Sequence, residues 1–419
     1  MRTWPSPSLP AIPGHGPAVH VRDSLTGATM VAAVGPVATL YVCGITPYDA
    51  THLGHAATSI AFDLLHRAWL DAGLEVRHAS NVTDIDDPLL ERAARTGVDW
   101  EQLAIEQTAL YAQDMTALAV LAPHTYLGAV ETIPTVVTAV EGLLERGLAY
   151  RVPVEQGAGG ERPDLGDVYA DIGSDPAIGH LPGLDHDQTL ALFTERGGDP
   201  ARTGKRDPLD PALWRRVRPG EPSWDGGVLG TGRPGWHIEC TVIAEQALGT
   251  AFDVQGGGRD LCFPHHEMSA AHARALGGAG ARVHMHTGMV GLDGDKMSKS
   301  LGNLVLVSVL RAQGVDPMAI RLAVLAHHYR TDWEWTDEVL RTAERRLERW
   351  RGAVSGNGGP DAGSTLAAIR NALADDLDAP AALRAVDAWA DASLTLGGDV
   401  IGAPGLLARS IDALLGVRV

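Results

Sequence analysis

The chain has 419 residues, which is long enough for two or three domains with a sizeable core. Its formal net charge of −18 argues against broad, non-specific binding to nucleic acid phosphates. No apolar run approaches the roughly 20 residues that a membrane-spanning helix needs, and prolines stand near the start where a signal peptide would have its apolar core. We therefore expect a cytoplasmic protein without a membrane partner.

The first part of the chain has the pattern of a strand, a helix and a second strand. Residues 1–37 are rich in Pro and Gly and predict an irregular N-terminal arm. Residues 38–46 are apolar and β-prone and end at Pro47, residues 52–73 repeat apolar side chains at helical spacing, and residues 74–83 predict another strand. A strand–helix–strand unit predicts an α/β fold with a Rossmann-like parallel sheet covered by helices.

The rest of the chain divides by composition. Residues 153–235 are rich in Gly, Pro and Asp and predict an inserted, irregular subdomain. The other expected elements are two helices within 100–149, strands at 250–258 and 283–292, helices at 316–329 and 336–350, a flexible linker at 355–364, and two or three further helices. We expect an arm at 1–37, a central domain at 38–335 and a C-terminal helical domain at 336–419.

Two histidines stand at the expected start of the first helix, directly after the first strand. His52 and His55 in "THLGHA" are three residues apart, so they share one helix face. A helix N-terminus at the carboxyl end of a parallel strand favours a phosphate, and imidazoles there can donate hydrogen bonds to it. A pair of capping or surface histidines would have the same spacing, so this motif alone leaves both interpretations open.

Lysine is rare in this chain, with Lys205, Lys296 and Lys299 against 31 arginines. Two of the three stand in the loop "GLDGDKMSKSLGN", residues 291–303, beside small serines and glycines. Lysine carries a compact charge on a flexible stem, which can follow a moving phosphate better than the planar fork of arginine. A solvated surface loop is the alternative, and the arginine bias argues against it.

Two cysteines and one histidine predict a metal site. Cys43, Cys240 and His265 are a normal set of zinc ligands, although they are distant in the sequence. Cys43 and Cys240 could instead be small core residues, which is the common fate of a free cysteine. Composition also leaves three competing ligands, namely Cys262, His237 and His266.

Taken together, these stretches resemble the catalytic domain of the class I aminoacyl-tRNA synthetases. "HLGH" and "KMSKS" match the two signature motifs of that family in the correct order. Among its members, cysteinyl-tRNA synthetase is similar over residues 38–335 in several stretches: "YVCG", "KRDPLDPALW", "GEPSWDGG", "GRPGWHIEC", "GGGRDLCFPHHE" and "DGDKMSKSLGN".

Three features depart from cysteinyl-tRNA synthetase and favour the paralogous cysteine:glucosaminyl-inositol ligases of mycothiol biosynthesis. "CGITPYDATHLGHAAT" and "ERGGDP" are similar to those ligases. Ser269 stands where the tRNA synthetases have a glutamate as a fourth zinc ligand. The tail from 353 to 419 holds eight Asp, four Arg and no Glu, whereas an anticodon-binding domain needs a basic surface. We interpret the run at 341–351, which interleaves Glu with Arg, as a solvated helix face.

The resemblance implies that ATP, accompanied by Mg²⁺, activates L-cysteine as cysteinyl-adenylate, which then acylates the amine of glucosaminyl-inositol. His52 and His55 would contact the α-phosphate, and Lys296 and Lys299 would hold the leaving pyrophosphate. One zinc ion per chain would be bound by Cys43, Cys240 and His265, with one position open for the substrate thiolate.

The resemblance also implies which residues line the adenylate. The first strand end, the first helix and the second strand end would surround cysteine and the phosphate, Trp236 would contact the cysteine backbone, "GRD" would meet the ribose, and Val290 would meet adenine. These residues are Cys43, Gly44, Ile45, Thr46, Thr58, Asn81, Val82, Thr83, Trp236, Gly258, Arg259, Asp260 and Val290. Asp260 is one candidate for the base that deprotonates the amine.

The partners expected from this resemblance are small molecules, namely L-cysteine, ATP and glucosaminyl-inositol, and no tRNA. We expect a monomer. Two alternatives stay open from the sequence: a cysteinyl-tRNA synthetase, and a non-catalytic zinc-binding paralogue. The intact "HLGH" and "KMSKS" argue against the second, because a non-catalytic copy has no reason to keep two rare lysines.

Overall fold

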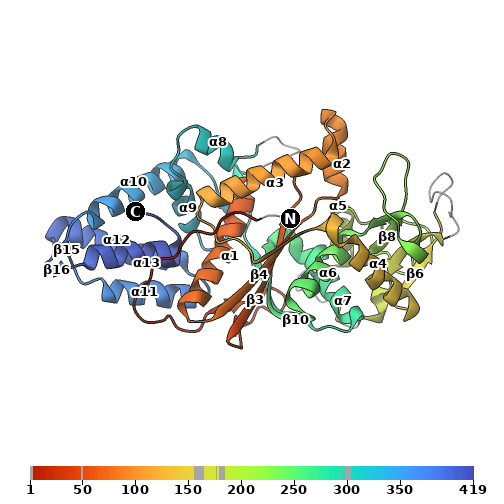
Figure 1. The fold of residues 1–419 in the computed structure, drawn as a ribbon, viewed down its shortest axis with the longest axis horizontal. Helices are drawn as coiled ribbons and strands as arrows, with labels where there is room; N and C mark the ends of the chain where they lie inside the picture. Colours follow the sequence, from red (N-terminus) through yellow and green to blue (C-terminus); the bar gives the residue numbers. More distant parts are fainter. Residues whose placement is uncertain are drawn as a thin grey trace.

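A five-stranded parallel sheet lies at the centre of the computed structural model, which describes residues 3–48, 51–154, 165–175, 177–178, 185–292, 294–297 and 303–419 (Figure 1). The strands are β3 (Val37–Ile45), β4 (Glu75–Val82), β5 (Thr125–Gly128), β10 (Ala251–Gly258) and β11 (Gly280–Thr287). Their order in the sheet is β11-β10-β3-β4-β5, and each neighbouring pair is parallel. The predicted Rossmann-like parallel sheet is therefore confirmed.

The strand order reverses between β3 and β10. The first half of the chain adds β4 and β5 on one side of β3, and the second half adds β10 and β11 on the other. In open α/β sheets, the carboxyl ends of the strands at such a reversal form a crevice where ligands bind. The fold thus places a candidate site beyond Ile45 and Gly258.

The centre of the sheet is covered on both faces, because successive side chains of a strand point in opposite directions. Leu40 and Val42 of β3 pack in one core cluster with α1 (Leu53–Asp71), whereas Tyr41 and Cys43 pack in another with α6 (Trp236–Leu248). This two-sided burial explains why residues 38–46 are almost continuously apolar rather than alternating.

Further helices connect the central strands: α2 (Asp87–Thr96), α3 (Trp100–Ala117), α4 (Ala129–Glu145) and α7 (Glu267–Leu276). Short helical turns precede α7, at Arg259–Leu261 and Cys262–His266. Of the two helices expected within 100–149, α3 and α4 are present, and β5 lies between them.

The inserted segment holds a regular sheet where an irregular subdomain was expected. An antiparallel sheet is formed by β6 (Ala149–Val152), β7 (Asp167–Ala170), β8 (Ala212–Arg216) and β9 (Gly232–Pro234), and α5 (His186–Glu195) lies between β7 and β8. These strands have three to five residues each. The Gly, Pro and Asp that separate such short strands dominate the composition and hide them in the sequence.

The C-terminal part is largely helical and forms one end of the elongated molecule, opposite the inserted sheet (Figure 1). Its helices are α8 (Val307–Ala312), α9 (Pro317–Leu325), α10 (Asp337–Val354), α11 (Gly363–Ala374), α12 (Ala379–Leu396) and α13 (Ala403–Leu415).

Short strands outside the two larger sheets lie in several parts of the chain: β1 (His20–Arg22), β2 (Thr29–Val31), β12 (Val290–Leu292), β13 (Asp295–Lys296), β14 (Trp333–Glu334), β15 (Gly358–Gly359) and β16 (Val400–Ile401).

The charged groups of α10 are paired both along the helix and across to α12. Arg345 contacts Glu338 at 2.7 Å in an exposed position, as expected for a solvated face. Arg346 and Arg349 instead contact Asp387 of α12 at 3.1 and 2.6 Å.

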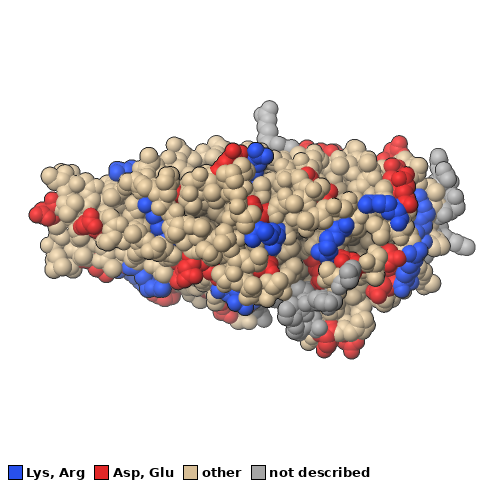
Figure 2. Space-filling model, turned by 90° about the horizontal axis from the view of Figure 1, so that it is seen from below, with Lys and Arg blue, Asp and Glu red and all other residues tan. Residues whose placement is uncertain are grey.

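On the face drawn in Figure 2, Lys and Arg side chains are scattered among acidic and uncharged ones. Among the described residues, no helix combines the length and apolarity needed to cross a bilayer.

Candidate active site

The candidate site lies where four strand ends meet the start of α1. β3 ends at Ile45, β4 at Val82, β10 at Gly258 and β11 at Thr287, all at the carboxyl edge of the sheet. Most of the residues predicted for the site stand at or just after these strand ends, because parallel strands bring their carboxyl ends to one edge.

The two histidines occupy the N-terminus of α1. His52 is its N-cap, and its Nδ1 accepts a hydrogen bond of 3.1 Å from the backbone N–H of Gly54. The rings of His52 and His55 lie 3.8 Å apart, centre to centre, at 32°. His52 therefore does cap the helix, and together with His55 it also forms a compact imidazole pair at the end of the helix that favours an anion.

The lysine loop falls largely outside the described residues. Lys296 is described only by its backbone, in β13, which pairs antiparallel with β12. Lys299 lies outside the described residues. The third lysine, Lys205, has its Nζ buried 3.0 Å from Asp199 Oδ1 and 2.7 Å from the carbonyl of Pro208. Lys205 is thus held within the inserted segment.

Cys43, Cys240 and His265 come together as expected. Their ligand atoms all lie within 4.8 Å of one another, and the three residues are buried. Hydrogen bonding from Cys43 and the charge of His265 lower the pKa of the Cys240 thiol, whereas burial raises the pKa of Cys43. Of the two thiols, Cys240 is therefore the easier to deprotonate, and a thiolate is the form of cysteine that binds a metal. The donor set fits zinc.

The competing ligands lie around this cluster rather than in it. His237 Nδ1 is 2.9 Å from His265 Nδ1, and His266 Nε2 is 3.1 Å from Cys43 Sγ. Cys262 is half-buried and is not part of the metal-binding group found among the described residues. Histidines that touch the ligands in this way commonly orient them.

Ser269 is buried, and its hydroxyl does not face the cluster as a ligand would. Its single O–H lies within hydrogen-bond distance of two backbone carbonyls, those of His265 at 2.8 Å and of His237 at 3.2 Å. Trp236 begins α6 and stacks on the ring of His265 at 4.2 Å. Among the described residues, the cluster therefore offers three side chains that could bind a metal, with an indole ring beside it.

The "CGIT" turn is fixed by Asn81. Its Oδ1 accepts hydrogen bonds from the Gly44 N–H at 2.9 Å and from the Tyr41 hydroxyl at 3.0 Å, and its Nδ2 donates to Thr83 Oγ1 at 3.1 Å. A side chain at position 44 would place a Cβ only 1.7 Å from the Asn81 carbonyl oxygen, so glycine is required there. Asn81 thus connects the ends of β3 and β4.

The neighbouring predicted residues of these two strand ends complete the turn. Ile45 and Val82 are buried, and the carbonyl of Ile45 accepts a hydrogen bond of 3.0 Å from the Thr83 N–H. Thr46 follows β3 directly and is half-buried, and its carbonyl accepts from the Tyr48 N–H at 3.0 Å. Ile45 and Val82 are therefore placed to support the site rather than to contact a ligand through their side chains.

The residues predicted for the nucleotide side lie around β10 and β11. Thr58 Oγ1 is 2.9 Å from Thr287 Oγ1 at the end of β11. Asp260 Oδ2 accepts a hydrogen bond of 3.2 Å from Arg196, at the end of α5. Its other oxygen, Oδ1, lies so close to Gly258 that a Cβ added to this glycine would be 2.5 Å from that oxygen. The inserted segment thus reaches the site through one charged contact.

Arg259 points away from its two neighbours in "GRD". Its guanidinium contacts Asp332 at 2.8 Å and the carbonyl of Arg330 at 2.5 Å, and its side chain is half exposed. Val290 is buried at the start of β12, where it pairs with Trp333 of β14. The side chain of Val290 is therefore enclosed in the core, whereas Arg259 joins the site to the segment after α9.

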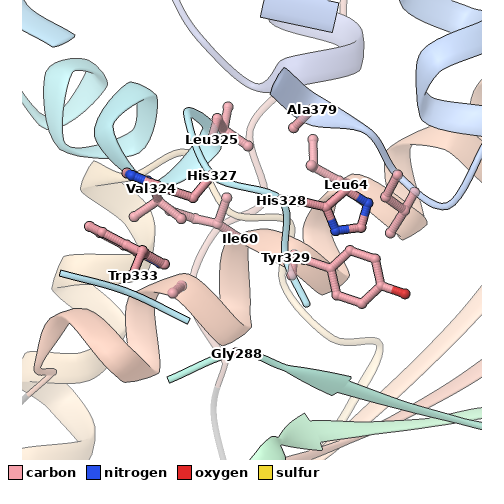
Figure 3. Close-up of a pocket in the computed structure, with 13 residues that line it drawn as sticks. Ile60, Leu64, Gly288, Val324, Leu325, His327, His328, Tyr329, Trp333 and Ala379 are labelled. Atoms are coloured by element: carbon pink, nitrogen blue, oxygen red, sulfur yellow. The ribbon is translucent and has the colours of Figure 1, made fainter. Parts of the chain in front are cut away.

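A pocket with about 360 Å³ of empty space, part of it open to solvent, lies between α1 and the segment after α9 (Figure 3). It is lined by α1, the segment after α9 and the start of α12, and none of the predicted site residues is among its lining residues. His327 and Trp333 stack at 4.2 Å on one wall. The pocket belongs to the junction between the central sheet and the C-terminal helices.

Sequence reasoning missed three residues of the site. Tyr41 supports Asn81, Thr287 contacts Thr58, and Arg196 contacts Asp260. Tyr41 and Thr287 carried a signal, since each lies on a predicted strand within reach of its carboxyl end. Arg196 lies in the quoted stretch "ERGGDP", but no spacing rule connects that stretch to Asp260, 64 residues away.

Residues 30–345 match the family described as the tRNA synthetases class I (C) catalytic domain. A protein of Sanguibacter keddieii named L-cysteine:1D-myo-inositol 2-amino-2-deoxy-alpha-D-glucopyranoside ligase is 65% identical over 425 residues, with 100% of each chain covered. Proteins of the same name in Cellulomonas flavigena and Streptomyces coelicolor are 63% and 58% identical, again with 100% of each chain covered.

Solved structures of similar fold are aminoacyl-tRNA synthetases. Methionyl-tRNA synthetase of Mycobacterium tuberculosis, in complex with methionyl-adenylate, has a TM-score of 0.60 and 16% identity over 90% of this chain and 89% of that one. An arginyl-tRNA synthetase structure from Campylobacter jejuni has a TM-score of 0.53 and 13% identity over 91% and 93%. At these identities the likeness establishes the fold alone.

Proposed function

The chain belongs to the class I (C) synthetase family and, within it, to the L-cysteine:1D-myo-inositol 2-amino-2-deoxy-α-D-glucopyranoside ligases, and from this premise we propose the reaction that it catalyses. ATP activates L-cysteine as cysteinyl-adenylate, and the amine of glucosaminyl-inositol then takes the cysteinyl group as an amide. The products are AMP and pyrophosphate, and the pathway is mycothiol biosynthesis.

The observation that carries this proposal is the full-length match to the ligases. It covers 100% of this chain and 100% of the relative, so it includes the inserted segment and the C-terminal helices as well as the two signature motifs. An enzyme that shared only the catalytic domain would diverge in exactly those two parts, which lie outside the central sheet.

In the first half-reaction, a carboxylate oxygen of cysteine attacks the α-phosphorus of ATP, and pyrophosphate leaves with the bonding electrons. This step requires charge stabilisation more than covalent catalysis. We place the α-phosphate at the start of α1, where the rings of His52 and His55 lie together at the positive end of the helix dipole. Lys296 and Lys299 would hold the pyrophosphate, with Mg²⁺ accompanying ATP.

Cys43, Cys240 and His265 would hold one zinc ion per chain. When bound, zinc supplies a strong preference for the thiolate of cysteine over the hydroxyl of serine at its open position. Ser269 supports this assignment, because its hydroxyl faces the backbone carbonyls of His265 and His237 and leaves the fourth position to the substrate. The rings of Trp236 and His265 would form the wall against which the cysteine backbone lies.

We assign the ribose to Asp260 and adenine to the backbone of Val290. A carboxylate can accept hydrogen bonds from both ribose hydroxyls, and Arg196 fixes one of its oxygens. In the second half-reaction, the neutral amine attacks the acyl carbon, AMP leaves, and the amine loses one proton. The contact with Arg196 supports Asp260 as a ribose ligand, because it fixes the carboxylate in one orientation.

We also propose that tRNA is not an acceptor and that the enzyme acts as a monomer in the cytoplasm. The tail from 353 to 419 is acidic, and several of its carboxylates are occupied by internal pairs, such as Asp387 with Arg346 and Arg349. A tRNA acceptor needs an extended basic surface, whereas an amino sugar needs only a pocket beside the adenylate.

The acceptor half-reaction provides the test. We expect cysteine-dependent AMP release with glucosaminyl-inositol in the micromolar to millimolar range that is usual for KM. We expect no charging of cysteine tRNA above background under the same conditions. Charging of tRNA at a comparable rate, without the amide product, would assign the chain to the cysteinyl-tRNA synthetases instead. Absence of any cysteine-dependent pyrophosphate exchange would support the non-catalytic alternative.

A further inference from the structure

Two side chains of α3 face the start of α1, although α3 carries none of the predicted site residues. Tyr111 and Asp114 are three residues apart, so they lie on one face of α3. The Tyr111 hydroxyl lies 2.9 Å from Ser59 Oγ, which donates a hydrogen bond of 2.9 Å to the carbonyl of His55. α3 therefore reaches the backbone of one candidate catalytic histidine through a single intervening side chain.

Asp114 faces the segment of the other histidine. Its side chain is fully buried, and Oδ1 accepts a hydrogen bond of 2.5 Å from Arg311 of α8. Oδ2 and the hydroxyl of Thr51, the residue before His52, are both buried without a hydrogen bond to any described residue. Burial raises the pKa of Asp114, while the hydrogen bond from Arg311 acts in the opposite direction.

Backbone hydrogen bonds join the same two segments. The Leu53 N–H donates to the carbonyl of Val305, and the Val307 N–H donates to the carbonyl of Thr51, both at 3.0 Å. His52 sits between these two bonds in a bridge with Leu306, just before α8 begins. The helix α3 thus contacts both sides of this bridge, because Asp114 binds Arg311 of α8 and Tyr111 contacts Ser59 of α1.

We propose that Asp114 is a positioning residue for adenylate formation, and that with Arg311 and Thr51 it holds His52 and His55 at the place where the α-phosphate reacts. This inference rests on the proposed function. Asp114 touches no substrate and acts through the residues that it fixes. A displacement of about 1 Å in a catalytic group can cost roughly 10²-fold in rate, so the fixing of these histidines has a measurable consequence.

The test separates the two half-reactions in the complete enzyme. Asp114→Asn removes the charge and nearly keeps the shape. We expect the kcat of cysteine-dependent ATP–pyrophosphate exchange to fall by about 10- to 100-fold, the KM for cysteine to stay within about twofold, and single-turnover transfer from preformed adenylate to the amine to stay near wild type. Arg311→Gln should give the same split, and Arg311→Lys should retain most of the activity.

A matched control lies at the other end of α1. Asp71 is the last residue of that helix and pairs with Arg370 at 2.7 Å, with side chains that are 8% and 11% exposed. Asp71→Asn should lower the unfolding temperature without separating the two half-reactions. Equal loss of both half-reactions in a folded Asp114→Asn or Arg311→Gln enzyme, or exchange at the wild-type rate, would overturn the inference. If the wild-type enzyme itself lacked exchange, the proposed function would be wrong instead.

Discussion

Asp63 of α1 and Arg321 of α9 form an ion pair whose side chains are both fully buried. Arg67 donates to the same carboxylate at 2.7 Å. Both arginines also donate to backbone carbonyls at the end of α13, Arg67 to Asp412 at 2.8 Å and Arg321 to Leu415 at 2.6 Å. This cluster joins the last helix of the chain to the helix that carries the two histidines.

Asp63→Ala should therefore strongly destabilise the protein. Burial alone would raise the pKa of Asp63, but the charges of Arg67 and Arg321 outweigh it and lower the value to about 2. Removing the carboxylate leaves two buried guanidinium groups without their counter-ion, and breaking a buried pair costs about 3–5 kcal/mol. Urea unfolding measures the change. Glu338→Gln, at the exposed pair with Arg345, is the control and should show no resolvable effect.

Metal content should depend on two of the three cysteines. Cys43→Ser and Cys240→Ser should each lose zinc and activity together, because thiolate is the strong ligand of the cluster. Cys262→Ser should keep both, since Cys262 lies outside the group. Metal analysis of the purified proteins measures the zinc content of each variant. Full zinc occupancy in Cys240→Ser would contradict the assignment of Cys240 as a zinc ligand.

His55→Ala and Lys299→Ala should slow adenylate formation more than they weaken cysteine binding. Each donor aimed at charge that develops in the transition state is typically worth about 10²–10³-fold in rate. Pyrophosphate exchange, measured over a range of cysteine concentrations, gives kcat and KM separately. A variant that exchanged pyrophosphate at nearly the wild-type rate would not have the phosphate role proposed for its residue.

Arg196→Ala should raise the KM for ATP by several-fold and leave the KM for cysteine nearly unchanged. Arg196 holds Asp260 from the inserted segment, so its loss releases the carboxylate proposed to bind the ribose. Arg274 provides the control, because it pairs with Asp175 at 2.6 Å and contacts no proposed ligand group. Equal effects of Arg196→Ala and Arg274→Ala would mean that the contact with Asp260 has no special role.

Stability should fall as the pH drops below about 6.5. Burial lowers the pKa of His66 to about 4, so between about pH 4 and 6.5 the folded protein binds fewer protons there than the unfolded chain, whose histidine has a pKa of about 6.5. The stabilisation present above pH 6.5 is lost through that window, on the order of 3 kcal/mol for this residue. Urea unfolding at several pH values gives the free energy of unfolding as a function of pH. Between about pH 4 and 6.5 this free energy should change less with pH in His66→Gln than in the wild type. The exposed His186→Gln is the control and should behave as the wild type does.

The sequence by itself determined the fold class and much of the site. Continuous apolar strands, helical spacing after "THLGH" and the two signature motifs predicted a parallel sheet with its site at the strand ends, and the sheet is confirmed. The three residues proposed to bind a metal were named on composition and resemblance, and they meet although Cys43 and Cys240 are 197 residues apart. The strand ends could be predicted because hydrophobic periodicity is a local property of the chain.

Only the tertiary structure decided which polar groups face one another. Arg259 and Asp260 are adjacent in "GRD", yet Arg259 contacts Asp332 and Asp260 contacts Arg196. Asp114 and Arg311, 197 residues apart, meet beside His52 without any local signal. The four short strands of the inserted segment likewise depend on partners far along the chain. Such pairings are fixed by burial and by the need of each buried charge for a counter-ion, which no periodicity encodes.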